Sequence, residues 1–247
     1  MQRSTIKTTA KVLALLGMAA YFILAITLFN HDSSPAVCTG LDIYVDDPFN
    51  TGFVTDSEVR DMLIREKEYP EGQALDSISL AHLEDVLHRY PYIDQAQCHY
   101  TPDGHIVMML TPRTPVLHVL DNSGRDYYID NCGDIMPRGY HTSNLIVLSG
   151  NVDSLTAGSL YAPLALRLNT DTFWMAQAQE IHINTKGDIE LIPRVGGHII
   201  ELGDTSNLND KLKRMRIFYR EGLSRTGWKK YSRISLKYDG QVVCTRR

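Results

Sequence analysis

The sequence predicts an α+β protein: an N-terminal transmembrane helix, then a β-α-α-β-β domain, and then a mostly antiparallel β-domain with a C-terminal helix and two terminal strands. Three features predict this architecture. An uncharged apolar run covers residues 12–29, a strand-helix-helix-strand-strand pattern covers residues 38–112, and short apolar runs separated by Gly, Asn and Asp fill residues 113–247. A hydrophobic content of 43% excludes a disordered chain, and a net charge of −4 argues against a dedicated nucleic-acid binder.

The apolar run, VLALLGMAAYFILAITLF, predicts an uncleaved single-pass membrane anchor. Its eighteen residues cover roughly 27 Å as a helix, about the hydrocarbon thickness of a bilayer. Three basic residues precede it: Arg3, Lys7 and Lys11. The positive-inside rule therefore places residues 1–11 in the cytoplasm and exports a linker at residues 30–37 and everything after it. A cleaved signal peptide is the alternative, but its apolar core is usually shorter and no A-x-A site closes the run.

The exported part of the chain contains all four cysteines: Cys38, Cys98, Cys132 and Cys244. An even number outside the cytoplasm permits disulfides, with three possible pairings, but the sequence does not show them. No C-x-x-C motif and no Cys/His cluster with zinc-ligand spacing occurs in the sequence. Small buried thiols are the simplest interpretation.

Residues 38–112 carry a compact series of strand and helix signals. Alternating apolar and polar side chains at residues 41–45 predict a half-buried strand. The sequence TDSE at residues 55–58 is a capping box that opens one helix, and a second helix begins near Ser79 and ends before Pro91. Each helix has an apolar face: Val59, Met62 and Leu63 in the first, and Leu80, Leu83, Val86 and Leu87 in the second. Two strands joined by a Pro-Asp-Gly turn complete the pattern: residues 96–100 and 106–110.

Residues 113–247 read mainly as strands separated by turns. Six short strands are predicted: residues 116–120, 127–129, 145–148, 181–183, 189–192 and 199–202. Successive hairpins of this kind favour antiparallel pairing. Helices are predicted near residues 161–168 and 171–178 and, most clearly, over residues 208–221, with Gly222 as the C-cap. Two final strands flank a tight Asp-Gly turn: residues 234–238 and 241–245.

The predicted helix at residues 208–221 has an apolar stripe and a basic face. The stripe is formed by Leu208, Leu212, Met215 and Tyr219. Five basic residues fall away from it, which predicts a solvated face: Lys211, Lys213, Arg214, Arg216 and Arg220. Trp228 and Tyr231, just before a predicted strand, are expected to be core anchors rather than a ligand site.

Motifs for catalysis, metals or cofactors are absent from the sequence. Asp126, Asp130 and Asp134 recur every four residues, but this spacing differs from a calcium-binding loop and favours a carboxylate-rich set of turns. Cys132-Gly133 invites comparison with exported cysteine transpeptidases, yet no neighbouring residue supplies the base that a nucleophilic cysteine needs. We therefore expect no catalytic residue, no metal, no cofactor and no small-molecule substrate.

Several stretches together resemble the FtsQ/DivIB family of bacterial cell-division proteins, in particular its Bacteroidota members. They are Pro91-Tyr92-Ile93 with Ala96, Arg113-Thr114-Pro115-Val116, Tyr127-Tyr128-Ile129-Asp130 with Gly133 and Met136-Pro137, Gly227-Trp228-Lys229-Lys230-Tyr231, and Ile234-Ser235-Leu236-Lys237-Tyr238. The resemblance rests on the order and spacing of these stretches and spans nearly the whole chain. It implies that residues 38–112 form a POTRA domain and residues 113–247 the family's β-domain.

The resemblance implies a scaffold rather than an enzyme. Members of the family bind the small bitopic proteins FtsB (DivIC) and FtsL at the division septum of the inner membrane, with the exported domains in the periplasm. The family uses its last β-domain strands and the preceding helix for this contact. The matching positions here are Tyr238, Gln241, Val242, Val243, Cys244 and Thr245. Other divisome proteins are expected to contact the POTRA-like domain and the transmembrane helix.

The last predicted strand is also a binding candidate on physical grounds. An edge strand with unpaired N–H and C=O groups accepts a partner strand, and residues 241–245 contain neither proline nor a blocking charge. Arg246 and Arg247, which follow, suit an acidic partner. A proline at Val243 would then remove a ladder N–H and abolish binding. The sequence alone leaves open whether this strand is an edge or an internal strand of the core.

Two other functions fit parts of the sequence. A POTRA-bearing envelope transport or assembly factor would share the first domain, but such proteins normally carry repeated POTRA modules. An exported cell-wall enzyme would depend on Cys132 as its nucleophile. Loss of function in Cys132→Ser, with folding and partner binding unchanged, would favour the enzyme.

Overall fold

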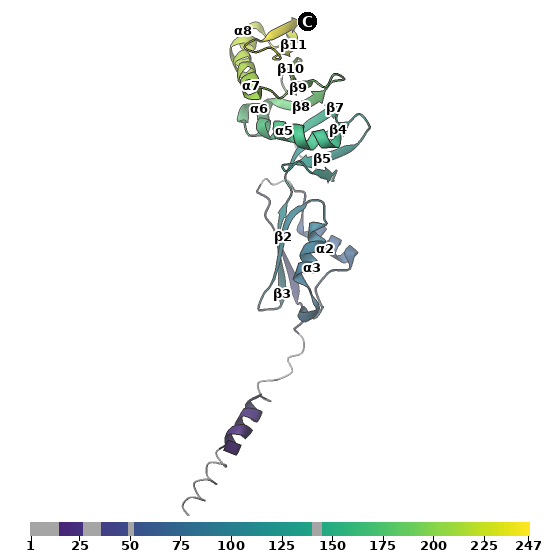
Figure 1. The fold of residues 1–247 in the computed structure, drawn as a ribbon, viewed down its shortest axis with the longest axis vertical. Coiled ribbons are helices and arrows are strands. Elements are labelled where there is room, and N and C mark those ends of the chain that lie inside the picture. The colour runs from purple at the N-terminus through teal and green to yellow at the C-terminus, as the bar shows by residue number, and fades with distance from the viewer. Residues whose placement is uncertain (1–14, 27–35, 49–51, 140–144) are drawn as a thin grey trace, which may run out of the picture. The chain divides into compact units, whose positions relative to one another are not determined.

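The computed structural model describes residues 15–26, 36–48, 52–139 and 145–247, and its framework is two β-sheets (Figure 1). By their contacts the residues divide into two compact units. The smaller comprises the described parts of Met1–Leu41, with Pro70–Ser79 and Tyr100–Ile106; the larger comprises Asp42–Tyr69, Leu80–His99 and Val107–Arg247. This division does not follow the predicted domain boundaries, which stay a prediction.

Residues 15–26, inside the predicted membrane span, form a helix with exposed apolar side chains. Within the described part of the chain, no helix is both long enough and apolar enough to cross a bilayer. Residues 12–14 and 27–29 of the predicted span lie outside the described residues. The transmembrane anchor therefore stays a prediction.

The three-stranded sheet has the predicted β-α-α-β-β order. Its strands are β1 (Gly40–Val45), β2 (Ile93–Tyr100) and β3 (His105–Pro112), in the spatial order β1-β3-β2. Helices α2 (Asp56–Glu66) and α3 (Leu80–His88) separate β1 from β2, with a short helix η1 (Leu75–Ser77) between them. The capping box is present, because the Thr55 hydroxyl accepts a hydrogen bond from the Glu58 N–H at 3.3 Å and the Glu58 carboxylate accepts one from the Thr55 N–H at 3.0 Å.

The nine-stranded sheet has the order β12-β11-β10-β9-β8-β7-β4-β5-β6. Its strands are β4 (Pro115–Asp121), β5 (Asp126–Asp130), β6 (Ile135–Pro137), β7 (Ile146–Gly150), β8 (Ala178–Ile183), β9 (Ile189–Pro193), β10 (Ile199–Gly203), β11 (Tyr231–Ser235) and β12 (Val243–Arg246). Five neighbouring pairs are antiparallel, which confirms the prediction of a mostly antiparallel sheet. Three pairs are parallel, β4 with β7, β7 with β8, and β10 with β11. Strand β6 was not predicted.

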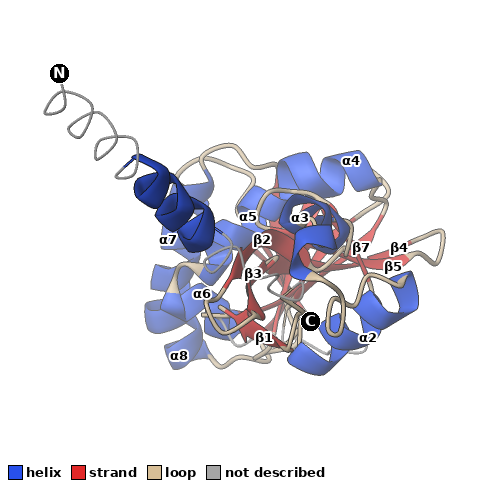
Figure 2. Ribbon diagram, turned by 90° about the horizontal axis from the view of Figure 1, so that it is seen from below, coloured by secondary structure: helices blue, strands red, loops and turns tan. Residues whose placement is uncertain are grey.

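Helical crossovers explain two of the parallel pairs, since parallel neighbours need a long connection. Between β7 and β8 lie α4 (Ser154–Thr156), η2 (Ala157–Tyr161), α5 (Ala162–Asn169) and α6 (Thr172–Gln177). Between β10 and β11 lie α7 (Leu208–Ile217), η3 (Phe218–Leu223) and α8 (Ser224–Thr226). Figure 2 places α5, α6, α7 and α8 together along one flank of the strands. Apolar side chains of η2, α5, α6, α7 and η3 share one core with the strands, which includes Leu148, Ile181, Leu191, Trp174 and Met215.

The last helix continues beyond the predicted stop at Gly222. It passes from α7 through the π-helical turn η3 into α8 and ends at Gly227, whose φ is 90°. Gly222 lies inside the helix, where a Cβ would come within 2.7 Å of the Phe218 ring. The extra turn carries Leu223 into the core, where it is fully buried. The predicted C-cap was therefore wrong, because a tertiary contact extends the helix past its local stop signal.

Of the five basic residues predicted to be solvated, Lys211 is buried and Arg214 is half-buried. Lys211 is only 2% exposed, and its Nζ donates to the carbonyl and a carboxylate oxygen of Asp204 at 3.0 and 2.7 Å. This hydrogen bond holds the pKa of Asp204 at about 2. The Arg214 side chain is 12% exposed and contacts the chain just before β12. The other three basic residues are exposed, as predicted.

The two final strands are displaced from their predicted positions. Strand β11 begins at Tyr231, before the predicted start, and β12 begins only at Val243, so the connection spans residues 236–242 rather than a two-residue turn. The predicted Asp239-Gly240 turn forms the tip of this loop. Trp228 and Tyr231 pack against the core, which confirms their prediction as anchors.

Candidate functional site

Strand β12 forms one edge of the nine-stranded sheet. It pairs antiparallel with β11, with Ser235 opposite Val243, Ile234 opposite Cys244 and Arg233 opposite Thr245. Among the described strands it has no neighbour on its other side. Strand β12 is therefore an edge strand of this sheet. The sequence alone had left open whether it is an edge or an internal strand.

The backbone groups of β12 that face away from β11 can be identified from its hydrogen bonds. The N–H of Arg247 donates to the carbonyl of Lys230 at 3.3 Å, on the β11 side. Because successive residues of an extended strand direct their N–H and C=O groups to opposite sides, Thr245 and Val243 also face β11. Cys244 and Arg246 therefore present their N–H and C=O groups to the outer edge, where a further strand would bind.

The side chains of β12 divide between the two faces of the sheet. Val242 and Cys244 are half-buried and pack against the main core. Val243 and Thr245 are exposed on the opposite face of the sheet. On the core side, burial raises the pKa of the Cys244 thiol. The edge thus offers a partner an exposed Val and Thr on one face and a covered thiol on the other.

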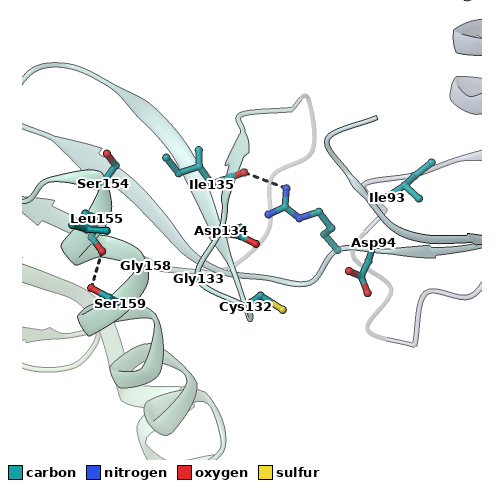
Figure 3. Close-up of a pocket in the computed structure, with 11 residues that line it drawn as sticks. Ile93, Asp94, Cys132, Gly133, Asp134, Ile135, Ser154, Leu155, Gly158 and Ser159 are labelled. Atoms are coloured by element: carbon teal, nitrogen blue, oxygen red, sulfur yellow. Dashed lines mark hydrogen bonds between the residues drawn. The ribbon is translucent and has the colours of Figure 1, made fainter. Parts of the chain in front are cut away.

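A second feature of the larger unit is a shallow hollow beside Cys132 (Figure 3). Its volume is about 780 Å³, and its lining includes Asp94, Arg113, Cys132, Asp134 and Leu155. Gly133 and Gly158 approach each other so closely at its wall that a Cβ on Gly133 would lie 2.9 Å from the carbonyl oxygen of Gly158.

The Arg113 side chain at this hollow is held in place by hydrogen bonds to a carboxylate and to backbone carbonyls. Its guanidinium donates to the Asp130 carboxylate at 2.7 and 2.8 Å and to the carbonyl oxygens of Pro91 at 3.0 Å and Ile135 at 3.1 Å. Asp130 also accepts hydrogen bonds from the backbone N–H groups of Cys132 and Asp134. Asp126 instead contacts His118 at 2.7 Å, so these regularly spaced aspartates have separate partners. No group of His, Cys, Asp or Glu within the described ranges has the geometry of a metal site.

Cys132 lies exposed in the hollow, and the described residues that line it supply no histidine or lysine to act as its base. The charged side chains among those residues are Arg113, which pairs with Asp130, and the carboxylates of Asp94 and Asp134. All four cysteines are free thiols. The expectation of buried thiols holds for Cys38, which is 1% exposed, and is wrong for Cys132.

Comparison with known protein families decides the classification of the chain. A POTRA-like domain model matches residues 36–111. A model described as FtsQ/DivIB, C-terminal related, matches residues 114–245, more than half of the chain.

The chain belongs to the FtsQ/DivIB family.

A named relative leads to the same family. The chain is 27% identical over 201 residues to the cell division protein FtsQ of Salinibacter ruber, a match that covers 76% of this chain and 77% of the relative. The FtsQ/DivIB resemblance expected from the sequence motifs is thereby confirmed. Membership assigns the chain to bacterial cell division, in a family of non-catalytic scaffolds.

The residues expected to bind partners in this FtsQ/DivIB member form one continuous region. Val243, Cys244 and Thr245 lie in β12, and Gln241 and Val242 lead into it. Tyr238 is 59% exposed and lies in the loop before them. Two roles at this edge were not expected from the sequence: the amide of Arg246 faces outward, and Arg214 contacts the loop from α7. Neither role has a local signal, because the first depends on how β12 pairs with β11 and the second on how α7 meets the loop before β12.

Proposed function

We propose that this FtsQ/DivIB family member is a membrane-anchored, non-catalytic divisome scaffold that captures FtsB/DivIC- and FtsL-type bitopic proteins by strand addition at β12. Residues 12–29 anchor it in the inner membrane, with residues 1–11 in the cytoplasm and residues 38–247 in the periplasm at the septum. The single observation that supports the binding mode most is the edge position of β12.

The edge is suited to a partner strand because nothing in it blocks pairing. Natural edge strands are usually protected by proline, a bulge or an inward charge. Strand β12 contains no proline, and its bulge lies in the neighbouring strand β11, between Tyr231 and Arg233. A partner strand would therefore pair with the outward N–H and C=O groups of Cys244 and Arg246.

The charge around the edge favours an acidic partner segment. Residues 208–247 contain twelve Lys and Arg residues but three Asp and Glu residues, and six of the twelve basic side chains form ion pairs within the chain. Arg246 is exposed beside the edge. Complementary charges of this kind steer association and discriminate against basic competitors, so partner binding should weaken as salt is raised.

The decisive variant is Cys244→Pro in the purified full-length chain. Proline removes an N–H that faces outward, so the ladder with β11 is kept while the partner loses a hydrogen bond and meets the proline ring. We expect binding to purified FtsB/DivIC- and FtsL-type ectodomains from the same organism to be lost. Calorimetry or interferometry measures binding, and circular dichroism checks folding.

Two controls accompany this variant. Cys244→Ala removes the thiol but keeps the N–H, and should bind as the wild type does. Val243→Pro removes an N–H that faces β11, so it should loosen β12 itself and is less informative than Cys244→Pro. Full binding by folded Cys244→Pro would exclude strand addition at β12.

A further inference from the structure

Arg214 contacts the loop that connects β11 to β12. From α7 its guanidinium donates to the carbonyl oxygen of Tyr238 at 2.9 Å, to that of Leu236 at 3.3 Å, and to that of Gln241. Its Nε donates to the Asp210 carboxylate, one helical turn earlier, at 2.7 Å. One side chain thus holds the start, the middle and the end of residues 236–242.

Arginine is specifically suited to this task. A guanidinium has five N–H donors in a planar fork and can satisfy a carboxylate and several carbonyls at once, whereas a lysine ammonium is a compact charge with three donors. The Asp210 carboxylate fixes the plane of the fork, and burial to 12% exposure excludes most competing water. Loss of the guanidinium would leave its carbonyl acceptors without this donor.

Other contacts fix the two ends of this loop. Leu236 is buried in the core and Lys237 pairs with Asp188 at 2.6 Å, while Val242 packs against the core just before β12. Between these ends, residues 238–241 make few further hydrogen bonds among the described residues. Within residues 236–242 the Gln241 N–H donates to the Tyr238 carbonyl at 3.3 Å, and the Leu236 N–H donates to the Glu201 carbonyl at 2.9 Å. Asn207 makes a long contact of 3.5 Å to Asp239. Gln241, the last residue that Arg214 holds, lies two positions before β12 begins.

We propose that Arg214 is a positioning residue for partner capture: it orders β12 before any partner arrives, with the amides of Cys244 and Arg246 already facing outward. This inference rests on the proposed strand addition at β12. A strand that is ordered in the free protein loses less conformational entropy on binding, and the binding-competent fraction of the protein is larger.

Amide hydrogen exchange on the full-length chain tests the ordering directly. In Arg214→Gln we expect exchange at Val243 and Thr245, whose N–H groups face β11, to accelerate by about tenfold or more. Exchange in β8 and β9 should stay unchanged, which separates a local positioning role from a general loss of stability. Arg214→Lys should behave like Arg214→Gln despite its charge, because the ammonium cannot span the loop. The matched control is Arg216→Gln on the same helix, whose exposed side chain pairs with Asp171.

Binding to the same ectodomains then tests the consequence. Arg214→Gln should bind about tenfold more weakly than the wild type, in proportion to its smaller competent fraction. Unchanged exchange at Val243 and Thr245, or acceleration throughout the sheet, overturns the proposal. Faster exchange confined to Val243 and Thr245, with binding as strong as in the wild type, also overturns the proposal for Arg214. In that case the proposed function still stands if Cys244→Pro abolishes binding. If the wild type binds none of these partners, the proposed function fails, and the exchange data alone decide whether Arg214 orders β12.

Discussion

At the scale of single residues, His198 is a buried titratable group near the C-terminus. It is 2% exposed, and its Nε2 lies 2.8 Å from the hydroxyl of Tyr219, while its Nδ1 has no partner within the described structure. Burial, assisted by the nearby Arg247 guanidinium, lowers the pKa of His198 below its usual 6.5. His198 is therefore neutral in the folded protein at neutral pH, and protonating it opposes folding.

Stability should consequently fall as the pH drops below about 6.5, since the unfolded chain then binds a proton that the folded chain resists. The contribution of neutral His198 to stability is fully present above about pH 6.5, the pKa of histidine in the unfolded chain. It is lost as the pH falls toward the lower pKa that His198 has in the folded protein. Melting temperatures of wild type and His198→Gln between about pH 7.5 and 5 test this. The variant should show a shallower decline than the wild type. Some decline will remain, because burial also lowers the pKa of His118. Parallel wild-type and His198→Gln curves would contradict the argument.

At the scale of elements, α2 shows how local chemistry sets helix boundaries. The capping box at Thr55 and Glu58 satisfies backbone N–H groups at the start of the helix. At the other end Lys67 adopts a φ of 64°, and its N–H closes the last turn on the Ile64 carbonyl at 3.1 Å. The helix then presents Val59, Met62 and Leu63 to the core.

Removal of the cap should cost about 1 kcal/mol in the free energy of unfolding, the usual loss for Thr→Ala at an N-cap. Thr55→Ala tests this in a urea titration followed by circular dichroism. Glu66→Ala, an exposed change in the last turn of the same helix, should stay within about 0.5 kcal/mol of the wild type. Equal effects of the two changes would show that the capping box adds nothing to stability.

At the scale of the whole molecule, the four thiols report on folding because their environments differ. Cys132 is exposed and Cys38 is buried. Burial raises the pKa of Cys98 to about 12 and also raises that of Cys244, which reduces the thiolate available for reaction.

We expect one rapidly reacting thiol in the native chain and four in denaturant. A chromogenic disulfide reagent at about pH 8, close to the usual thiol pKa, counts both populations. Cys132→Ser should abolish the fast phase and leave the slow one intact. Two or more fast thiols in the native wild type would mean that the burial of Cys98 or Cys244 is not maintained in solution.

Features with a local cause could be predicted from the sequence. The capping box, the apolar faces of α2 and α3, the alternation in β1 and the family motifs all lie within short stretches of the chain. Predictions from the sequence were wrong where a contact with a residue distant in the chain overrides a local signal. The helix passes Gly222 because Leu223 is needed in the core, and Lys211 is buried because Asp204 is close enough to neutralise it.

The proposed binding site shows the same division between sequence and structure. The sequence by itself determined the family, the mostly antiparallel character of the second sheet and the region of the chain expected to meet a partner. Only the tertiary structure decided that β12 is an edge, that Cys244 and Arg246 rather than Val243 face outward, and that Arg214 holds the preceding loop. Strand order and hydrogen-bond direction depend on which segments become neighbours after folding, and a one-residue change in register reverses the direction of every amide.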